Sequence, residues 1–135
     1  MRPSIYRRAT IDVMRIARQV PMVPAQRRMQ LGALVEARKA AALPWSAIFT
    51  KAYALTAREM PVLRRGYFRY PAPRFVDYPV SAAAIAVERE LDGESVVCPL
   101  IVPDPSALTL RELSQRIQRA KTAPVDEVTT PMESG

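Results

Sequence analysis

Few side chains in this 135-residue sequence can carry out proton transfer or nucleophilic attack, because the chain contains no histidine. Histidine is the usual general base near neutral pH and a common metal ligand. Its absence excludes Ser-His-Asp and Cys-His mechanisms and His-ligated zinc sites. Chemistry by this chain alone would therefore depend on carboxylates, lysine, tyrosine or the single cysteine, Cys98.

The first candidates have simpler structural interpretations. Cys98 has no histidine partner and lies in a predicted strand, which favours a buried thiol over a nucleophile. Glu88 and Glu90 are two residues apart and could pair for acid–base work, but a solvated strand face explains the same spacing. Lys51 would serve as a base if it were buried, and we expect it at the exposed edge of a helix.

The remaining candidates are serines, aspartates and tyrosines without the spacing of a known site. Ser46 and Ser81 lack the Gly-x-Ser-x-Gly turn of a hydrolase, so we interpret them as a helix cap and a strand start. The aspartates do not have metal-ligand spacing; they are Asp77, Asp104 and Asp126. The tyrosines are better suited to packing than to base stacking; they are Tyr53, Tyr67, Tyr70 and Tyr78. The sequence therefore assigns no catalytic residue and no metal ligand, and it leaves any cofactor-binding residues unknown.

Composition indicates one globular domain. The chain is 49% apolar and 24% charged, which is ordinary for a folded protein. One cysteine excludes an internal disulfide and favours a reducing compartment, so we expect a cytoplasmic location. No run of about 18 apolar residues is present to span a membrane. The N-terminus does not resemble a secretory signal, although its arginines leave an organelle transit peptide as an alternative.

The net charge of +7 is unevenly distributed. Residues 1–70 hold 14 Lys and Arg against 3 acidic residues, whereas residues 71–135 hold 6 against 10. The arginines occur singly or in pairs, and no nucleic-acid motif accompanies them. A solvated basic face, or a site for a small anion, is therefore favoured over a nucleic-acid surface.

Apolar periodicity predicts three helices before a strand hairpin. The first 20 residues fit a short amphipathic helix that Pro21 stops, and residues 33–42 are rich in helix formers. Residues 46–60 form the clearest helix, and its predicted buried stripe is Ile48, Phe49, Ala52, Leu55 and Met60. Residues 25–31 are predicted to be either an edge strand or an early start of the next helix. Residues 61–80 contain a proline-broken connector.

Residues 81–91 and 95–102 are predicted strands, joined by Asp92-Gly93, the strongest hairpin signal in the chain. Ile85, Val87 and Leu91 share one face, and the two glutamates share the other. Alanines on both faces of the first strand's first half predict burial against a close helix. The order of elements is that of an α+β fold.

A final helix follows the hairpin. Thr109 and Glu112 form a capping box, and an apolar stripe continues to about Lys121 through Leu110, Leu113, Ile117 and Ala120. Residues 124–135 have no periodicity and are predicted to be loose.

Four segments of the chain, in collinear order over about residues 10–122, resemble the catalytic domain of the dihydrolipoyl acyltransferases. This is the 2-oxoacid dehydrogenase acyltransferase family, which shares the chloramphenicol acetyltransferase fold. The helix that contains Lys51-Ala52-Tyr53-Ala54-Leu55 resembles the family's Lys-Ala-x-Ala-Leu helix. The other similar segments are Leu34–Arg38, the hairpin Ala84–Val87 with Asp92-Gly93 and Val96–Pro99, and the helix from Leu108 to Lys121.

The resemblance implies a partial chloramphenicol acetyltransferase-like α+β fold, with residues 1–123 as the N-terminal part of the domain and 124–135 as a tail. It implies acyl transfer between coenzyme A, whose thioester is the co-substrate, and a thiol or hydroxyl acceptor. It also implies trimers with active sites between subunits. The family's His-x-x-x-Asp-Gly motif has no counterpart here, so we expect this chain to be inactive alone.

The expected partners are further copies of the chain or a full-length relative. Two alternatives to the acyltransferase interpretation remain open. One is a non-catalytic interaction module that docks on a full-length relative. The other is a basic anion-binding protein that uses residues 1–70.

Overall fold

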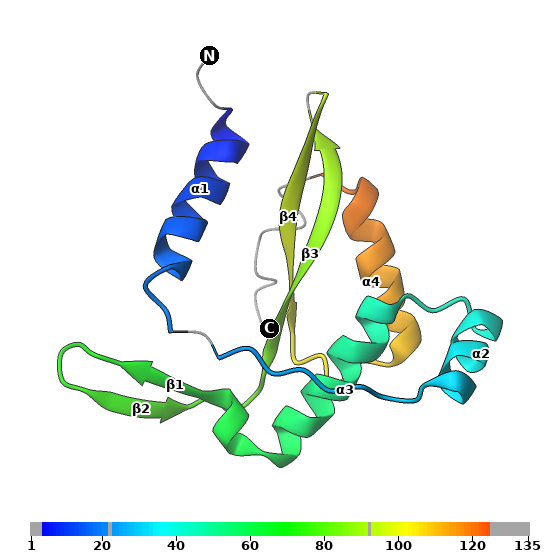
Figure 1. Cartoon of the computed structure of the whole chain (residues 1–135), viewed down its shortest axis with the longest axis horizontal. Helices are drawn as coiled ribbons and strands as arrows, with labels where there is room; N and C mark the ends of the chain where they lie inside the picture. The colour runs from blue at the N-terminus through cyan, green and yellow to red at the C-terminus, as the bar shows by residue number, and fades with distance from the viewer. Residues whose placement is uncertain (1–3, 22, 92, 125–135) are drawn as a thin grey trace.

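The computed structural model describes residues 4–21, 23–91 and 93–124, and it has an α+β fold (Figure 1). The predicted fold class is therefore confirmed: helices pack on an antiparallel hairpin. The elements in chain order are α1 (Ile5–Ala17), α2 (Gly32–Ala40), α3 (Trp45–Glu59), a short 3-10 helix η1 (Pro61–Arg64), β1 (Arg65–Phe68), β2 (Arg74–Asp77), β3 (Ala82–Leu91), β4 (Glu94–Pro103) and α4 (Leu110–Thr122).

The main layer is the antiparallel hairpin of β3 and β4, which runs in register from Ala82 opposite Pro103 to Leu91 opposite Glu94. Helices α3 and α4 contact each other, and both contact β3 (Figure 1). Gly93 has a φ of +75°, a conformation that suits glycine and a hairpin turn. Asp92 lies outside the described residues.

Side chains alternate across this hairpin, as the pleat of a strand requires. The inner face meets the helices, and its residues Val87, Val96, Cys98, Leu100 and Val102 are buried. The outer face, as we define it, consists of Ala82, Ala84, Ala86, Val97, Pro99, Ile101 and Pro103, all of which are exposed. The predicted burial of β3 alanines on both faces is therefore wrong for the outer face, because no described element covers it.

Helix α4 matches its prediction closely. Thr109 accepts a hydrogen bond from the Glu112 backbone, and the Glu112 carboxylate accepts one from the Thr109 backbone, which completes the capping box. Leu113, Ile117 and Ala120 are buried against the hairpin. Leu110, at the first position of the stripe, is half-buried.

Helix α3 forms where predicted, but it turns a different face to the core. Its buried residues are Ala47, Ala54 and Ala57. Phe49 and Met60 from the predicted stripe are about half exposed, at 47% and 48%. Alanine lets the helix backbone approach its neighbours closely, whereas Phe49 stacks on Trp45 of the same helix and stays half exposed. The prediction that this stripe is the buried face of the helix is therefore wrong.

Other segments of the chain contribute less to this core. Residues 25–31 are irregular, neither strand nor helix, and residues 61–80 contain η1 and the small β1–β2 hairpin instead of a plain connector. Helix α1 makes an ion pair between Arg7 and Glu94 at the turn end of the main hairpin. Hydrogen bonds from Ser4 and Arg7 lower the pKa of the Glu94 carboxyl.

Candidate functional site

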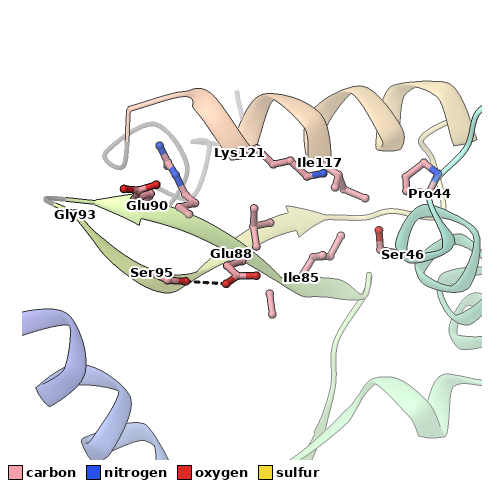
Figure 2. Close-up of a pocket in the computed structure, with 12 residues that line it drawn as sticks. Pro44, Ser46, Ile85, Glu88, Glu90, Gly93, Ser95, Ile117 and Lys121 are labelled. Carbon is pink, nitrogen blue, oxygen red and sulfur yellow. Dashed lines mark hydrogen bonds between the residues drawn. The ribbon is translucent and has the colours of Figure 1, made fainter.

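A cavity of about 750 Å³ lies along the edge of β3 that faces away from β4 (Figure 2). Six consecutive strand residues, 85–90, form one wall of this cavity. The N-terminus of α3, the C-terminal half of α4 and the turn end of the hairpin form the rest. The lining residues outside β3 are Pro44, Ser46, Gly93, Ser95, Ile117 and Lys121.

The strand edge is itself a polar feature of this cavity. In the described part of the chain, β3 pairs only with β4. Every second residue of β3 therefore directs its backbone N–H and C=O groups away from β4. Such an edge is able to pair with another extended chain.

Arg89 places a cation within the cavity wall. It lies on the inner face of β3, opposite Val96, so its side chain points toward α4. Its Nη2 donates a hydrogen bond to the carbonyl oxygen of Ala123, just after α4. Its Nε and Nη1 are buried and have no hydrogen-bond partner among the described residues. Buried donors are normally satisfied, so these two groups mark a position where an acceptor would be stabilised.

The acidic residues of the cavity lie on the opposite face of the strand. Ser95 donates a hydrogen bond of 2.7 Å to the Glu88 carboxylate, and Figure 2 shows this contact on the outer side of the hairpin. Glu90 is also exposed. The cavity edge therefore presents a cation toward the helices and two carboxylates toward the outer face.

Several predicted candidates have structural roles instead of catalytic ones. Cys98 is buried in β4, which confirms the buried-thiol interpretation. Ser46 is not a helix cap, because α3 begins at Trp45 with Pro44 at its N-cap. Ser81 precedes β3, and its carbonyl accepts a 2.9 Å hydrogen bond from Asp104.

Lys51 is half-buried, not exposed as the sequence suggested. Its Nζ donates to the carbonyl oxygens of Ser106 and Leu108, at 2.6 and 2.5 Å. These hydrogen bonds engage the ammonium group in holding α3 to the loop before α4, so they support a structural role for this lysine.

The aspartates and tyrosines are spread over separate places. Arg65 donates to both carboxylate oxygens of Asp77, at 2.6 and 3.0 Å; this lowers the pKa of the Asp77 carboxyl and raises that of the guanidinium. Tyr67 packs on Phe75 with ring centroids 5.6 Å apart. The others have local contacts or exposed rings: Asp104 accepts from Ser106, Tyr78 packs near Phe68, and Tyr53 and Tyr70 are exposed. Asp126 lies outside the described residues.

Two arginines of the first half bind backbone carbonyl groups. Arg64 donates to the carbonyl oxygens of Tyr78 and Pro79, and Arg38 donates to that of Leu43. Within residues 4–21, 23–91 and 93–124, no group of three His, Cys, Asp or Glu side chains could hold a metal ion. No helix in those ranges is long and apolar enough to cross a membrane.

Sequence reasoning missed Arg89. A signal was present, because an arginine at the parity of Ile85, Val87 and Leu91 puts a charge on an otherwise apolar strand face. What the sequence could not reveal is that two guanidinium donors there stay without acceptors.

Comparison with known proteins identifies no family for this chain. No protein-family model matches the sequence, and no curated protein matches it. The fold and the cavity define an α+β chain in which no described element covers the outer face of the hairpin or pairs with the second edge of β3.

Proposed function

We propose that this chain is a hairpin-and-helix component of an acyltransferase-like assembly, which transfers no acyl group alone and acts by packing against further copies of itself. The observation that carries the proposal is the outer face of the β3–β4 hairpin. It is apolar from the pair Ala82 and Pro103 as far as Ala86 and Val97, and Glu88 and Glu90 continue it toward the turn. No described element covers it; Val97 is 61% and Ile101 38% exposed. A contiguous exposed apolar patch is typical of an interaction surface.

The shape of the outer face favours a second copy as its occupant. Its β3 side carries three alanines, and its β4 side carries the larger Val97, Pro99 and Ile101. In a two-fold arrangement, the bulky strand of one copy would lie over the alanine strand of the other. Sheets pack face to face at about 10 Å when their side chains interdigitate in this way.

The total exposed area supports the same conclusion. The chain exposes 11222 Å², whereas a compact monomer of 15.1 kDa exposes about 7100 Å². Apolar residues contribute to this excess on α3 as well as on the hairpin, since Phe49 and Tyr53 are 47% and 59% exposed. Burial of such surface in an assembly would stabilise it by about 25 cal/mol per Å² of apolar area.

The expected lack of activity rests on the missing base. In the family that the chain resembles, a histidine removes the proton from the attacking thiol or hydroxyl. General base catalysis contributes about 10²–10⁴-fold to such a reaction. This chain has no histidine, and Cys98 and Lys51 are engaged in packing and helix contacts. Coenzyme A thioesters remain the co-substrate of the parent chemistry, and the cytoplasm remains the proposed location.

A matched pair of substitutions tests whether the outer face is the assembly surface. Val97→Lys introduces a charge on that face at its most exposed large apolar residue, opposite Glu88, and Val62→Lys introduces the same charge on η1, where the valine is 57% exposed. We expect Val97→Lys to reduce the mass measured by light scattering to that of one chain, whereas Val62→Lys leaves the mass of the unmodified protein. Equal masses for the two variants would contradict the proposed surface.

A further inference from the structure

Helix α1 presents an exposed apolar stripe, which we define as Val13, Ile16 and Val20, the last of these in the turn after the helix. We propose that this stripe binds the surface of an anionic lipid bilayer. The helix lies in the plane of the bilayer surface, with the stripe against the acyl chains and the arginines of the segment at the level of the lipid phosphates. This inference goes beyond the proposed self-assembly, because it uses a different surface and a partner that is not a protein.

The residues of the stripe share one face and are open to solvent. They are three and four positions apart, which places their side chains on the same side of a helix. The backbone N–H of Val20 donates to the Ala17 carbonyl oxygen at 3.1 Å, so Val20 continues the turn of α1. Val13 and Ile16 are each 66% exposed, and Val20 is exposed as well. Three β-branched apolar side chains are therefore available to a partner.

The stripe faces away from the main hairpin. Arg7 anchors α1 to that hairpin through its ion pair with Glu94. At 3.6 residues per turn, the row that contains Arg7, Ile11 and Met14 lies about 150° around the helix from the stripe. Figure 1 shows the main hairpin between α1 and α4, and residues 10–17 of α1 are all exposed. A broad surface can therefore approach the stripe while α1 keeps its anchor.

The charges of this segment indicate an anionic partner. Between residues 4 and 35 the sequence has six arginines and one acidic residue, Asp12. Arg8, Arg15 and Arg18 are exposed, and none of them forms an ion pair with a described residue. All three lie on the side of the helix opposite the stripe. The segment therefore combines an aliphatic face with a cationic one.

A bilayer surface matches both features at once. A surface helix buries its apolar face about 5–10 Å into the boundary between headgroups and acyl chains. Because a helix with its side chains is about 10–12 Å across, the arginines on the far side stay at the depth of the headgroups. Their long side chains reach lipid phosphates from there. A helix with a basic polar face and an aliphatic stripe is typical of such binding.

Flotation of the full chain with lipid vesicles tests the proposal, because only vesicle-bound protein rises in a density gradient. The probes are vesicles of an equal mixture of phosphatidylcholine and phosphatidylglycerol, and the control is phosphatidylcholine alone. We expect the chain to bind the mixed vesicles at least about tenfold more tightly, and we expect added salt to reduce this difference by screening the arginines. Equal affinity for the two kinds of vesicle, or no binding at millimolar lipid, would overturn the proposal.

Two substitutions with the same change in charge test the stripe. Ile16→Glu places a carboxylate in the stripe, whereas Val23→Glu places one at a 91% exposed position outside α1. We expect Ile16→Glu to bind the mixed vesicles about tenfold more weakly than Val23→Glu, because it loses apolar burial and gains a charge that the bilayer disfavours. Circular dichroism without lipid should be the same for both variants, since neither residue lies in the core. Equal vesicle binding by the two would contradict a role for the stripe.

A second pair of variants tests the charge. Arg15→Gln with Arg18→Gln removes two arginines of α1, and Arg58→Gln with Arg111→Gln removes two exposed arginines of α3 and α4. We expect the first double variant to bind the mixed vesicles about tenfold more weakly than the second. These variants decide the question if Ile16→Glu lowers the helix content, and equal affinities would overturn the proposal. A lower assembly mass for Ile16→Glu with unchanged vesicle binding would assign the stripe to a second copy of the chain instead.

Discussion

Lys51, in the middle of α3, donates from its Nζ to the carbonyl oxygen of Leu108, 2.5 Å away and two residues before α4 begins. The same ammonium group donates to the carbonyl oxygen of Ser106. One side chain of α3 thus holds the loop that leads into α4, the other helix on the inner face of the main hairpin.

Replacement of Lys51 by methionine should lower the free energy of unfolding by about 2 kcal/mol, because charged hydrogen bonds to two carbonyl groups are lost. Urea denaturation measures this change. Lys39→Met is the matched control, since Lys39 forms an exposed pair with Glu36 within α2 and should cost about 0.5 kcal/mol or less. Equal losses for the two variants would contradict the role of Lys51.

The N-terminal cap of α4 predicts a pH dependence. Hydrogen bonds from the Thr109 backbone and side chain lower the pKa of the Glu112 carboxyl, with smaller contributions from Arg116 and Lys51. A lowered folded-state pKa stabilises the protein above the unfolded pKa, and this stabilisation is lost as the pH falls through the folded pKa. Glu112→Gln should therefore reduce stability at neutral pH and flatten the acid part of the stability curve.

The measurement is the melting temperature of both proteins across acid and neutral pH. Asp77 and Glu94 also have lowered pKa values, so the variant should retain part of the acid sensitivity. Parallel curves for the variant and the unmodified protein would exclude a role for Glu112 ionisation. Thr109→Ala provides a second test of the cap and should cost about 1 kcal/mol.

Gly93 should tolerate a side chain poorly. Its φ of +75° costs an alanine about 1–2 kcal/mol, although no atom lies within 4 Å of the position that a Cβ would take. Gly32 is the control, because it lies at the start of α2 with equally open space and an ordinary helical backbone. Denaturation should show that Gly93→Ala is destabilised and Gly32→Ala is not; the reverse order would contradict the observed turn.

The chain alone should transfer no acyl group from acetyl-CoA to a thiol acceptor above the uncatalysed rate. The physical reason is the absence of histidine, and the measurement is release of free coenzyme A at neutral pH. Cys98→Ala serves as the control for any reaction at the single thiol. Turnover that survives this substitution would show that other residues carry out the chemistry.

Local signals predicted much of the fold. The capping box of Thr109 and Glu112, the glycine of the hairpin turn and the alternation of Ile85 and Val87 each depend on neighbours in the sequence, and each appears in the structure. The β1–β2 hairpin was missed because its strands have four residues each and offer too little alternation to detect. The division between residues 1–123 and a tail stays a prediction.

The orientation of α3 and the position of Arg89 could not be predicted from the sequence, because both depend on contacts between distant segments. Phe49 belongs to the apolar stripe that periodicity favours for burial, yet Ala47, Ala54 and Ala57 face the core, where their small side chains permit close packing. The unsatisfied donors of Arg89 depend on where the end of α4 lies, which no local pattern encodes. Phe49 is left 47% exposed, whereas the Arg89 donors are buried without an acceptor among the described residues.

Sedimentation velocity of the unmodified chain over a dilution series tests the central claim most directly. The account predicts a species heavier than one 15.1 kDa chain at low micromolar concentration, which dissociates on dilution. A single compact monomer at every concentration, with a cooperative melt, would show that these 135 residues close their own core and would contradict the proposed assembly.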